Sequence, residues 1–260
     1  MDLDRALLGF ASGLVIAAVT SPVGVSGAVF LLPVQMSVLH VPNPQLTPTN
    51  LLYNVVSGPG ALLRYARQGQ LGGPLTWHLA LGSAPGVVIG AVLRVYVAAD
   101  PTVFRLVAAA VLLPTGVYIL RSNRARAAPT TRARWRPRTI SLAAFAVGIV
   151  GGIYGIGGGS ILGPLLVGSG MAVSVVAPAA LASTLLTSVV GVATFAVLQA
   201  GAPGFVAQDW ALGLACGLGG LVGGYVGAAV QPRLPERLLR TALGLLAVVL
   251  AIAYLAQAMA

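Results

Sequence analysis

Two glycine-rich segments interrupt long apolar runs in this sequence, one in each half of the chain. The segment at 24–33 reads GVSGAVFLLP, and the segment at 151–164 reads GGIYGIGGGSILGP. Gly24 and Gly155 are 131 positions apart, and so are Pro33 and Pro164. Neither a glycine cluster nor an internal proline suits an unbroken helix. The pattern therefore predicts one structural unit, containing a broken helix, that occurs twice.

The apolar runs between these segments are long enough to cross a membrane. The runs at 80–98, 103–120 and 211–230 each approach the ~20 residues that a helix needs to cross ~30 Å of hydrocarbon. Hydrophobic residues make up 57% of the 260 residues and charged residues only 8%, which is more apolar surface than one soluble core could bury. Runs of this length also argue against the ~10-residue alternating strands of an outer-membrane barrel. We therefore expect an all-α integral membrane protein.

Ten apolar elements follow from these runs, five in an N-terminal repeat (1–120) and five in a C-terminal repeat (139–260). They lie at about 5–22, 26–39, 47–66, 75–98, 102–120, 139–154, 158–170, 175–199, 208–230 and 236–257. The second element of each repeat is short and begins at the glycine cluster. The sequence leaves open whether it spans the membrane or re-enters it, so we expect eight to ten transmembrane segments.

The arginines predict how the chain is oriented. All fifteen basic residues are arginines, and seven of them lie in 121–138, between two hydrophobic blocks. A short basic run in that position is typical of a cytoplasmic loop under the positive-inside rule, and we expect no nucleic-acid partner. With five crossings in each repeat, Arg64, Arg67 and the arginines of 233–240 fall on the same cytoplasmic side. The turn at Asp100 then falls outside.

An odd number of crossings would make the second repeat upside down relative to the first. Inverted repeats of this kind are the plan of many secondary transporters. If the short elements re-enter instead, the count falls to eight and the repeats become parallel. We expect inversion, with 121–138 as a basic cytoplasmic linker between the two repeats.

The glycine segments are the first candidates for a binding site. In lipid every backbone N–H needs a partner, so a broken helix is stable only where it faces protein or a polar cavity. The first N–H groups of the two short elements, near Ser26 to Ala28 and Gly157 to Ser160, lack intrahelical acceptors and can bind an anion. The alternative is that these glycines only permit sharp turns and close packing. Duplication at matching positions favours the binding site.

Polar residues in the third element of each repeat are the second candidates. Asn50 and Asn54 share one helical face. In the second repeat, Ser183 and Thr187 have the same spacing, and so do Thr184 and Ser188. Serine and threonine in membrane helices often only bond to the preceding turn. An unpaired amide in hydrocarbon is costly, so each asparagine should face a partner or a polar cavity.

The composition of the predicted spans excludes several function classes. No Asp, Glu or Lys lies deep inside a span, whereas a proton pump normally needs buried carboxylates. Cys216 and His78 stand without evident catalytic or metal-binding partners, so we expect no enzyme activity, no metal and no cofactor. The expected partners are a small anionic substrate and the lipid bilayer. The sequence leaves the oligomeric state open, with a homodimer as one alternative.

Taken together, these features resemble the sulfite exporter TauE/SafE family of membrane permeases. The resemblance covers almost the whole chain outside 121–138. It is carried by GVSGAVFLLPV at 24–34, TPTNLLYNV at 47–55, GIVGGIYGIGGGSILGPLL at 148–166 and ASTLLTS at 182–188. It implies a bacterial inner-membrane permease for small sulfur-containing or organic anions such as sulfite, thiosulfate or sulfoacetate.

By position, the resemblance also implies a set of substrate-facing residues. They are Ser26, Gly27, Asn50, Asn54, Gly157, Gly158, Gly159, Ser160, Ser183 and Thr187. With the cell interior negative, moving one negative charge outward gains ~2.3 kcal/mol per 100 mV, so export needs no coupled ion. We therefore expect export. Import of the same anions, and with less support a membrane-embedded enzyme, are the alternatives.

Overall fold

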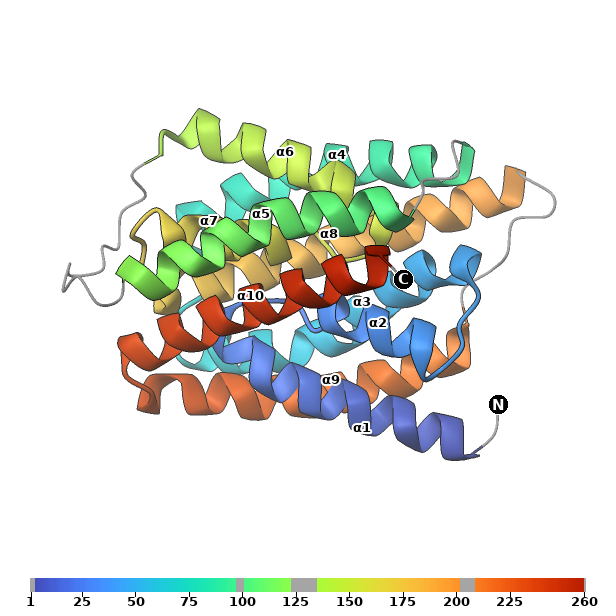
Figure 1. The fold of residues 1–260 in the computed structure, drawn as a ribbon, viewed down its shortest axis with the longest axis horizontal. Coiled ribbons are helices and arrows are strands. Elements are labelled where there is room, and N and C mark those ends of the chain that lie inside the picture. Colours follow the sequence, from blue (N-terminus) through green and yellow to red (C-terminus); the bar gives the residue numbers. More distant parts are fainter. Residues whose placement is uncertain (1–2, 97–100, 123–134, 202–208, 260) are drawn as a thin grey trace.

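The computed structural model describes residues 3–96, 101–122, 135–201 and 209–259, and its regular elements there are helices (Figure 1). The first half contains α1 (Leu3–Thr20), the 3₁₀ turn η1 (Ser21–Val23), α2 (Ala28–Ser37), α3 (Asn43–Arg67), α4 (Pro74–Tyr96) and α5 (Pro101–Ser122). The second half contains α6 (Pro137–Tyr154), α7 (Gly159–Gly168), α8 (Val173–Gly201), α9 (Trp210–Val230), the 3₁₀ turn η2 (Gln231–Arg233) and α10 (Glu236–Met259). The expected all-α architecture is confirmed for these residues. Asp100 and most of the 121–138 linker lie outside them.

Among the described residues, six helices are long and apolar enough to cross a membrane, judged by length and composition: α1, α4, α6, α8, α9 and α10. The two helices that follow the glycine segments are much shorter. α2 and α7 have ten residues each, or ~15 Å at the usual rise per residue, about half of the hydrocarbon thickness. The predicted short broken helices at the glycine motifs are therefore present.

Backbone geometry explains why the chain breaks where it does. Gly24 and Gly155 adopt φ of 75° and 73° at the ends of η1 and α6, in the left-handed region that side chains disfavour. Within α2, Pro33 has no N–H to donate to the carbonyl of Val29. The buried Tyr254 hydroxyl of α10 donates to that carbonyl instead, at 2.9 Å. The packing of α10 against α2 therefore gives a partner to the carbonyl that the proline leaves without its helical hydrogen bond.

Small residues allow the long helices to pack with their backbones in contact. On α4, a side chain at Gly82, Gly86 or Gly90 would overlap the backbone of α6. On α9, Gly213 and Gly217 instead leave room for the Leu52 and Val56 side chains of α3. Such contacts stabilise helix association in lipid, where burial from water cannot drive it. The glycine rows of α4 and α9 are thus packing surfaces.

The helices pair in an order that is unchanged when the two halves are exchanged. α1 packs against α9 and α6 packs against α4, while α3 packs against α8 and α5 against α10. If each helix is replaced by its counterpart in the other half, the α1–α9 pair becomes the α6–α4 pair. The α3–α8 and α5–α10 pairs are each converted into themselves. α3 and α8, which follow the two breaks, lie at the centre of this arrangement (Figure 1).

Contacts between elements show which helix ends lie together. At one end of the bundle, called the Arg5 end, Arg5 of α1 donates to the Leu39 carbonyl just after α2. At the other, called the Arg240 end, Arg240 of α10 donates to Val167 at the end of α7. Gln231, after α9, donates to Pro22 of η1 at this second end. Hence α1 runs towards the Arg240 end, and the following bend with α2 brings the chain back.

Candidate substrate-binding site

One side chain of α3 touches both helix breaks. The Ser26 hydroxyl donates to Asn54 Oδ1 at 2.5 Å, and Asn54 Nδ2 donates to the Gly155 carbonyl at 3.5 Å. Ser26 belongs to the first break and Gly155 to the second, and both partners of Asn54 are buried. The predicted polar face of the third element therefore lies where the two halves meet.

At the first break, nearby polar groups already satisfy several backbone groups. Asn50 Nδ2 donates to the Ala28 carbonyl at 3.0 Å, and the Ala28 N–H donates to the Ser26 hydroxyl at 3.1 Å. The Phe30 and Leu31 amides donate to the Gly27 carbonyl. In this conformation the start of α2 is thus closed by its own turn and by Asn50. The Ser26 hydroxyl is a partner that a bound anion could replace.

The second break has a side chain in the corresponding role. The Gly158 N–H donates to Thr187 Oγ1 at 3.3 Å, and Thr187 Oγ1 donates in turn to the Ser183 carbonyl at 2.8 Å. Ser160 is turned away, since its hydroxyl donates to the Ile156 carbonyl of the preceding turn at 2.8 Å. Gly158 and Thr187 are therefore brought together, whereas Ser160 bonds within its own turn.

The three glycines of the second break are enclosed by neighbouring helices. A methyl group at Gly157 would lie 2.5 Å from the Thr184 side chain, and one at Gly158 would lie 2.5 Å from the Ser83 hydroxyl. One at Gly159 would overlap the Ala180 carbonyl. Gly157 also has a φ of 71°. These positions leave no room for a side chain, because groups of α4 and α8 approach the backbone directly.

Sequence reasoning missed two residues of this region, Tyr53 and Ser83, and it gave Thr184 only as a further polar residue of α8. The Ser83 and Thr184 hydroxyls, like that of Ser183, are buried and have no hydrogen-bond partner among the described residues. Unpaired buried hydroxyls are uncommon and often mark functional positions. Thr184 belongs to the predicted polar segment of α8, where it directly follows Ser183. Ser83 gave no such signal, since only tertiary packing brings α4 to the second break.

A small cavity lies between the first break, α3 and α8. Its volume is about 20 Å³, which is enough for roughly one water molecule. It is lined by Ala17, Ser21, Ser26, Gly27, Tyr53, Asn54, Ser57, Gly58, Ala61, Leu181, Thr184, Leu185 and Gly220. An oxyanion with several heavy atoms does not fit, so this is a closed conformation of the centre of the bundle.

A much larger cavity opens near the Arg240 end. Its volume is about 540 Å³, and α4, α6 and α8 all contribute to its walls. The lining residues include His78, Trp135, Ile140, Ser174 and Ala179. We call it the vestibule. Ala179 precedes Ala180, whose carbonyl closes over Gly159. The vestibule thus ends one residue from the wall of the second break.

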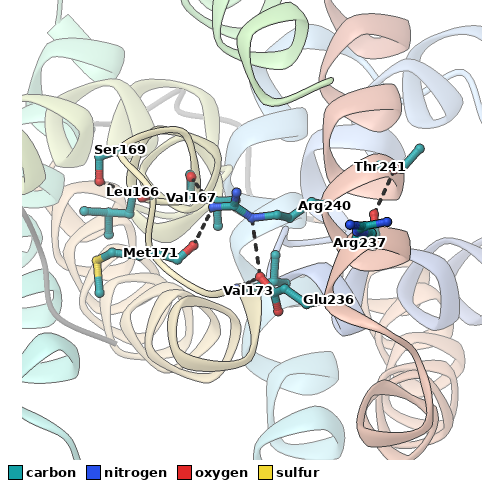
Figure 2. Close-up of polar contacts among 9 residues, drawn as sticks. All are labelled: Leu166, Val167, Ser169, Met171, Val173, Glu236, Arg237, Arg240 and Thr241. Atoms are coloured by element: carbon teal, nitrogen blue, oxygen red, sulfur yellow. Dashed lines mark hydrogen bonds and ion pairs between the residues drawn. The ribbon is translucent and has the colours of Figure 1, made fainter. Parts of the chain in front are cut away.

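A buried arginine fixes the far end of α7 (Figure 2). Arg240 Nη2 donates to the carbonyls of Val167 and Met171 at 3.0 and 3.1 Å. Glu236 lies 3.5 Å from Arg240 Nε and accepts the Val173 N–H at 2.7 Å. The sequence predicted Arg240 only as a cytoplasmic orienting charge. In the structure it is 7% exposed and ties α10 to the turn between α7 and α8.

The site offers hydrogen-bond donors without fixed charges. Asn54, Ser26, Thr184, Thr187 and Ser83 are all neutral at physiological pH. No cluster of three or more metal-ligating side chains exists among the described residues. Neutral donors beside helix N-termini can hold a negative solute, whereas a fixed carboxylate would repel it.

Comparisons with known proteins agree with this geometry. No curated protein matches the chain. The family model described as "Sulfite exporter TauE/SafE" matches residues 9–254, which is nearly the whole sequence and includes both breaks, α3 and α8. The chain is therefore a multi-pass membrane protein that belongs to the sulfite exporter TauE/SafE family.

Proposed function

We propose that this protein is an inner-membrane permease that exports small sulfur-containing or organic anions, such as sulfite, thiosulfate or sulfoacetate. The observation that carries the proposal is the position of Asn54, which bonds to both breaks at once. A side chain that joins the two halves at their interrupted helices is placed to respond to a solute bound between them. Family membership supports the same class of cargo.

The substrate site in this proposal consists of the two breaks and the polar face of α3 and α8. In the closed conformation the Ala28 and Gly158 amides donate to Ser26 and Thr187, respectively. An anion would take over these amides and accept hydrogen bonds from the released Thr187 hydroxyl and from the unpaired hydroxyls of Ser83 and Thr184. Opening towards the vestibule would supply the volume that the 20 Å³ cavity lacks.

We also propose that the two halves are inverted repeats. Two observations support it. The helix pairs keep their order when the halves are exchanged. In addition, α2 ends near Arg5 at one end of the bundle, whereas α7 ends near Arg240 at the other. Two broken helices that point to opposite ends suit alternating access around one central site.

The direction of transport follows from electrostatics in this proposal. The polar side chains at the breaks are neutral, so a transported anion carries its own charge through the membrane potential. Outward movement gains ~2.3 kcal/mol per unit charge per 100 mV. Import against the same potential requires a coupled ion, and measuring flux at imposed potentials of both signs distinguishes the two directions.

The test compares two threonines on α8 in proteoliposomes loaded with sulfite or thiosulfate. Thr187 and Thr194 both donate to the carbonyl four residues earlier at 2.8 Å, but Thr187 also accepts the Gly158 N–H. A hydrogen bond to a charged group contributes ~1.5–3 kcal/mol. Thr187→Val should therefore weaken the apparent affinity about 10- to 100-fold, and Thr194→Val should leave it unchanged.

If Thr187→Val and Thr194→Val change the apparent affinity equally, the second break is not part of the substrate site. Asn50→Ala provides a second measurement, since Asn50 holds the Ala28 carbonyl at the first break. If the folded Thr187→Val and Asn50→Ala proteins both transport normally, the site assignment is wrong. If the unchanged protein carries none of these anions at either polarity, the proposed substrate class is wrong.

A further inference from the structure

An apolar groove runs between α3 and α9 on the outer surface of the bundle. Its volume is about 280 Å³. It is lined by Pro59, Gly60, Leu63, Leu221, Val222, Tyr225 and Val226. Leu63 and Val226 are each 50% exposed. A side chain at Gly60 would overlap the Leu221 carbonyl, so the floor of the groove is bare backbone.

Two arginines of α3 lie beside this groove, around the ring of Tyr225. The guanidinium carbons of Arg64 and Arg67 each lie 5.9 Å from the centre of that ring, and Arg67 Nη1 donates to the Tyr225 hydroxyl at 3.0 Å. Tyr225 itself lines the groove. The aromatic ring therefore connects the apolar channel to a pair of cations.

This pair of cations lacks a counter-charge within the part of the chain that the structure describes. No described carboxylate lies within ion-pair distance of Arg64 or Arg67, and Arg64 Nε is buried without a hydrogen-bond partner there. The two guanidiniums belong to the Arg240 end, because the neighbouring Tyr65 donates to Ser21 of η1. The positive-inside rule makes that end cytoplasmic, where anionic lipids are found.

We propose that this groove is a binding site for one anionic phospholipid of the inner leaflet. The phosphate would lie between Arg64 and Arg67, and one acyl chain would fill the groove down to Pro59. The span from Pro59 to Arg67 is eight residues, or ~12 Å along the helix, which is close to the ~15 Å of one hydrocarbon leaflet. A phosphate alone would not explain the apolar channel, and an acyl chain alone would not explain the two cations beside it.

Charge argues against a second copy of the chain as the occupant. Two copies inserted in the same orientation would place the arginines of both copies at the same level of the membrane. Contact through this groove would then bring four uncompensated cations together. An anionic lipid neutralises the pair instead.

The experiment measures lipid binding to the purified full-length protein by native mass spectrometry. Phosphatidylglycerol, phosphatidylcholine and free glycerol 3-phosphate are titrated separately. We expect one tightly bound phosphatidylglycerol per chain, and no comparable binding of the other two. Arg64→Gln with Arg67→Gln should weaken phosphatidylglycerol binding about thirty-fold, the factor for two residues at ~1 kcal/mol each. The matched control is Arg136→Gln with Arg138→Gln, which removes the same charge at the same end from the exposed start of α6, a helix that packs chiefly against α4.

A third variant tests the groove itself. Val226→Trp fills the channel without changing charge and should also weaken phosphatidylglycerol binding. Equal binding of phosphatidylcholine, unchanged binding to the Arg64/Arg67 variant, or an equal loss in the control pair would each overturn the proposal. Binding of glycerol 3-phosphate with the same affinity would assign the site to a free phosphate. A dimer that the Val226→Trp change disrupts would assign the groove to a second copy.

Discussion

Replacing Gly27 with alanine should destabilise the protein, because the new methyl group would collide with the Tyr53 hydroxyl. Tyr53→Phe should remove that collision. Gly27 has a φ of −58°, so alanine fits the backbone without strain. The added methyl group would overlap the Tyr53 hydroxyl. Tyr53 cannot move aside easily, because it is buried and its ring already lies against Gly220 of α9. Overpacking of this kind costs ~1–3 kcal/mol.

Tyr53→Phe should restore most of that loss. Without the hydroxyl, the nearest remaining atoms to the new methyl group are the ring carbon that carried it, at 3.1 Å, and the Ile16 side chain, at 3.2 Å. Small shifts relieve contacts of that length. Tyr53→Phe alone removes at most one hydroxyl hydrogen bond, worth about 1 kcal/mol. The two substitutions should therefore couple favourably by about 1–2 kcal/mol.

The assay is equilibrium unfolding in mixed micelles for the four members of the double-mutant cycle. Gly24→Ala serves as the control, since Gly24 has a φ of 75° and its methyl group would overlap the Ala177 backbone. Tyr53→Phe should not rescue Gly24→Ala. Additive effects of Gly27→Ala and Tyr53→Phe would refute the packing described for the first break, as would equal rescue of the control.

Two further predictions address the Arg240 end and the polar centre. Arg240→Gln removes two hydrogen bonds from a buried charged group and should lower the free energy of unfolding by roughly 3 kcal/mol. The exposed Arg237→Gln should change it by less than ~0.5 kcal/mol in the same unfolding assay, and equal losses would contradict the anchoring role. Asn54→Asp keeps the shape but adds a charge. At roughly 5 Å and an effective dielectric of ~20, it would repel a monoanion by ~3 kcal/mol, so anion flux into proteoliposomes should fall more than 100-fold. Undiminished flux would place the anion elsewhere.

Local sequence alone determined much of this fold. Apolar runs of about 20 residues can satisfy their backbone groups in lipid only as helices, so the elements appear close to their predicted limits. Glycine and proline act within a few residues, which is why the breaks at Gly24 and Gly155 could be located from their spacing. The polar face with Asn54 was predictable for the same reason, because a buried amide needs a partner wherever the helix packs.

Tertiary structure decided which groups meet at the breaks. Ser83 reaches Gly158 only because the α4 glycine row packs on α6, and Thr184 contacts Gly157 only because α8 lies against α7. The same holds for Arg240: its charge and place in the sequence indicated the cytoplasmic end, but burial against Val167 depends on how α10 meets α7. Contacts between elements distant in sequence depend on side-chain shape across several helices at once, and no local pattern encodes them.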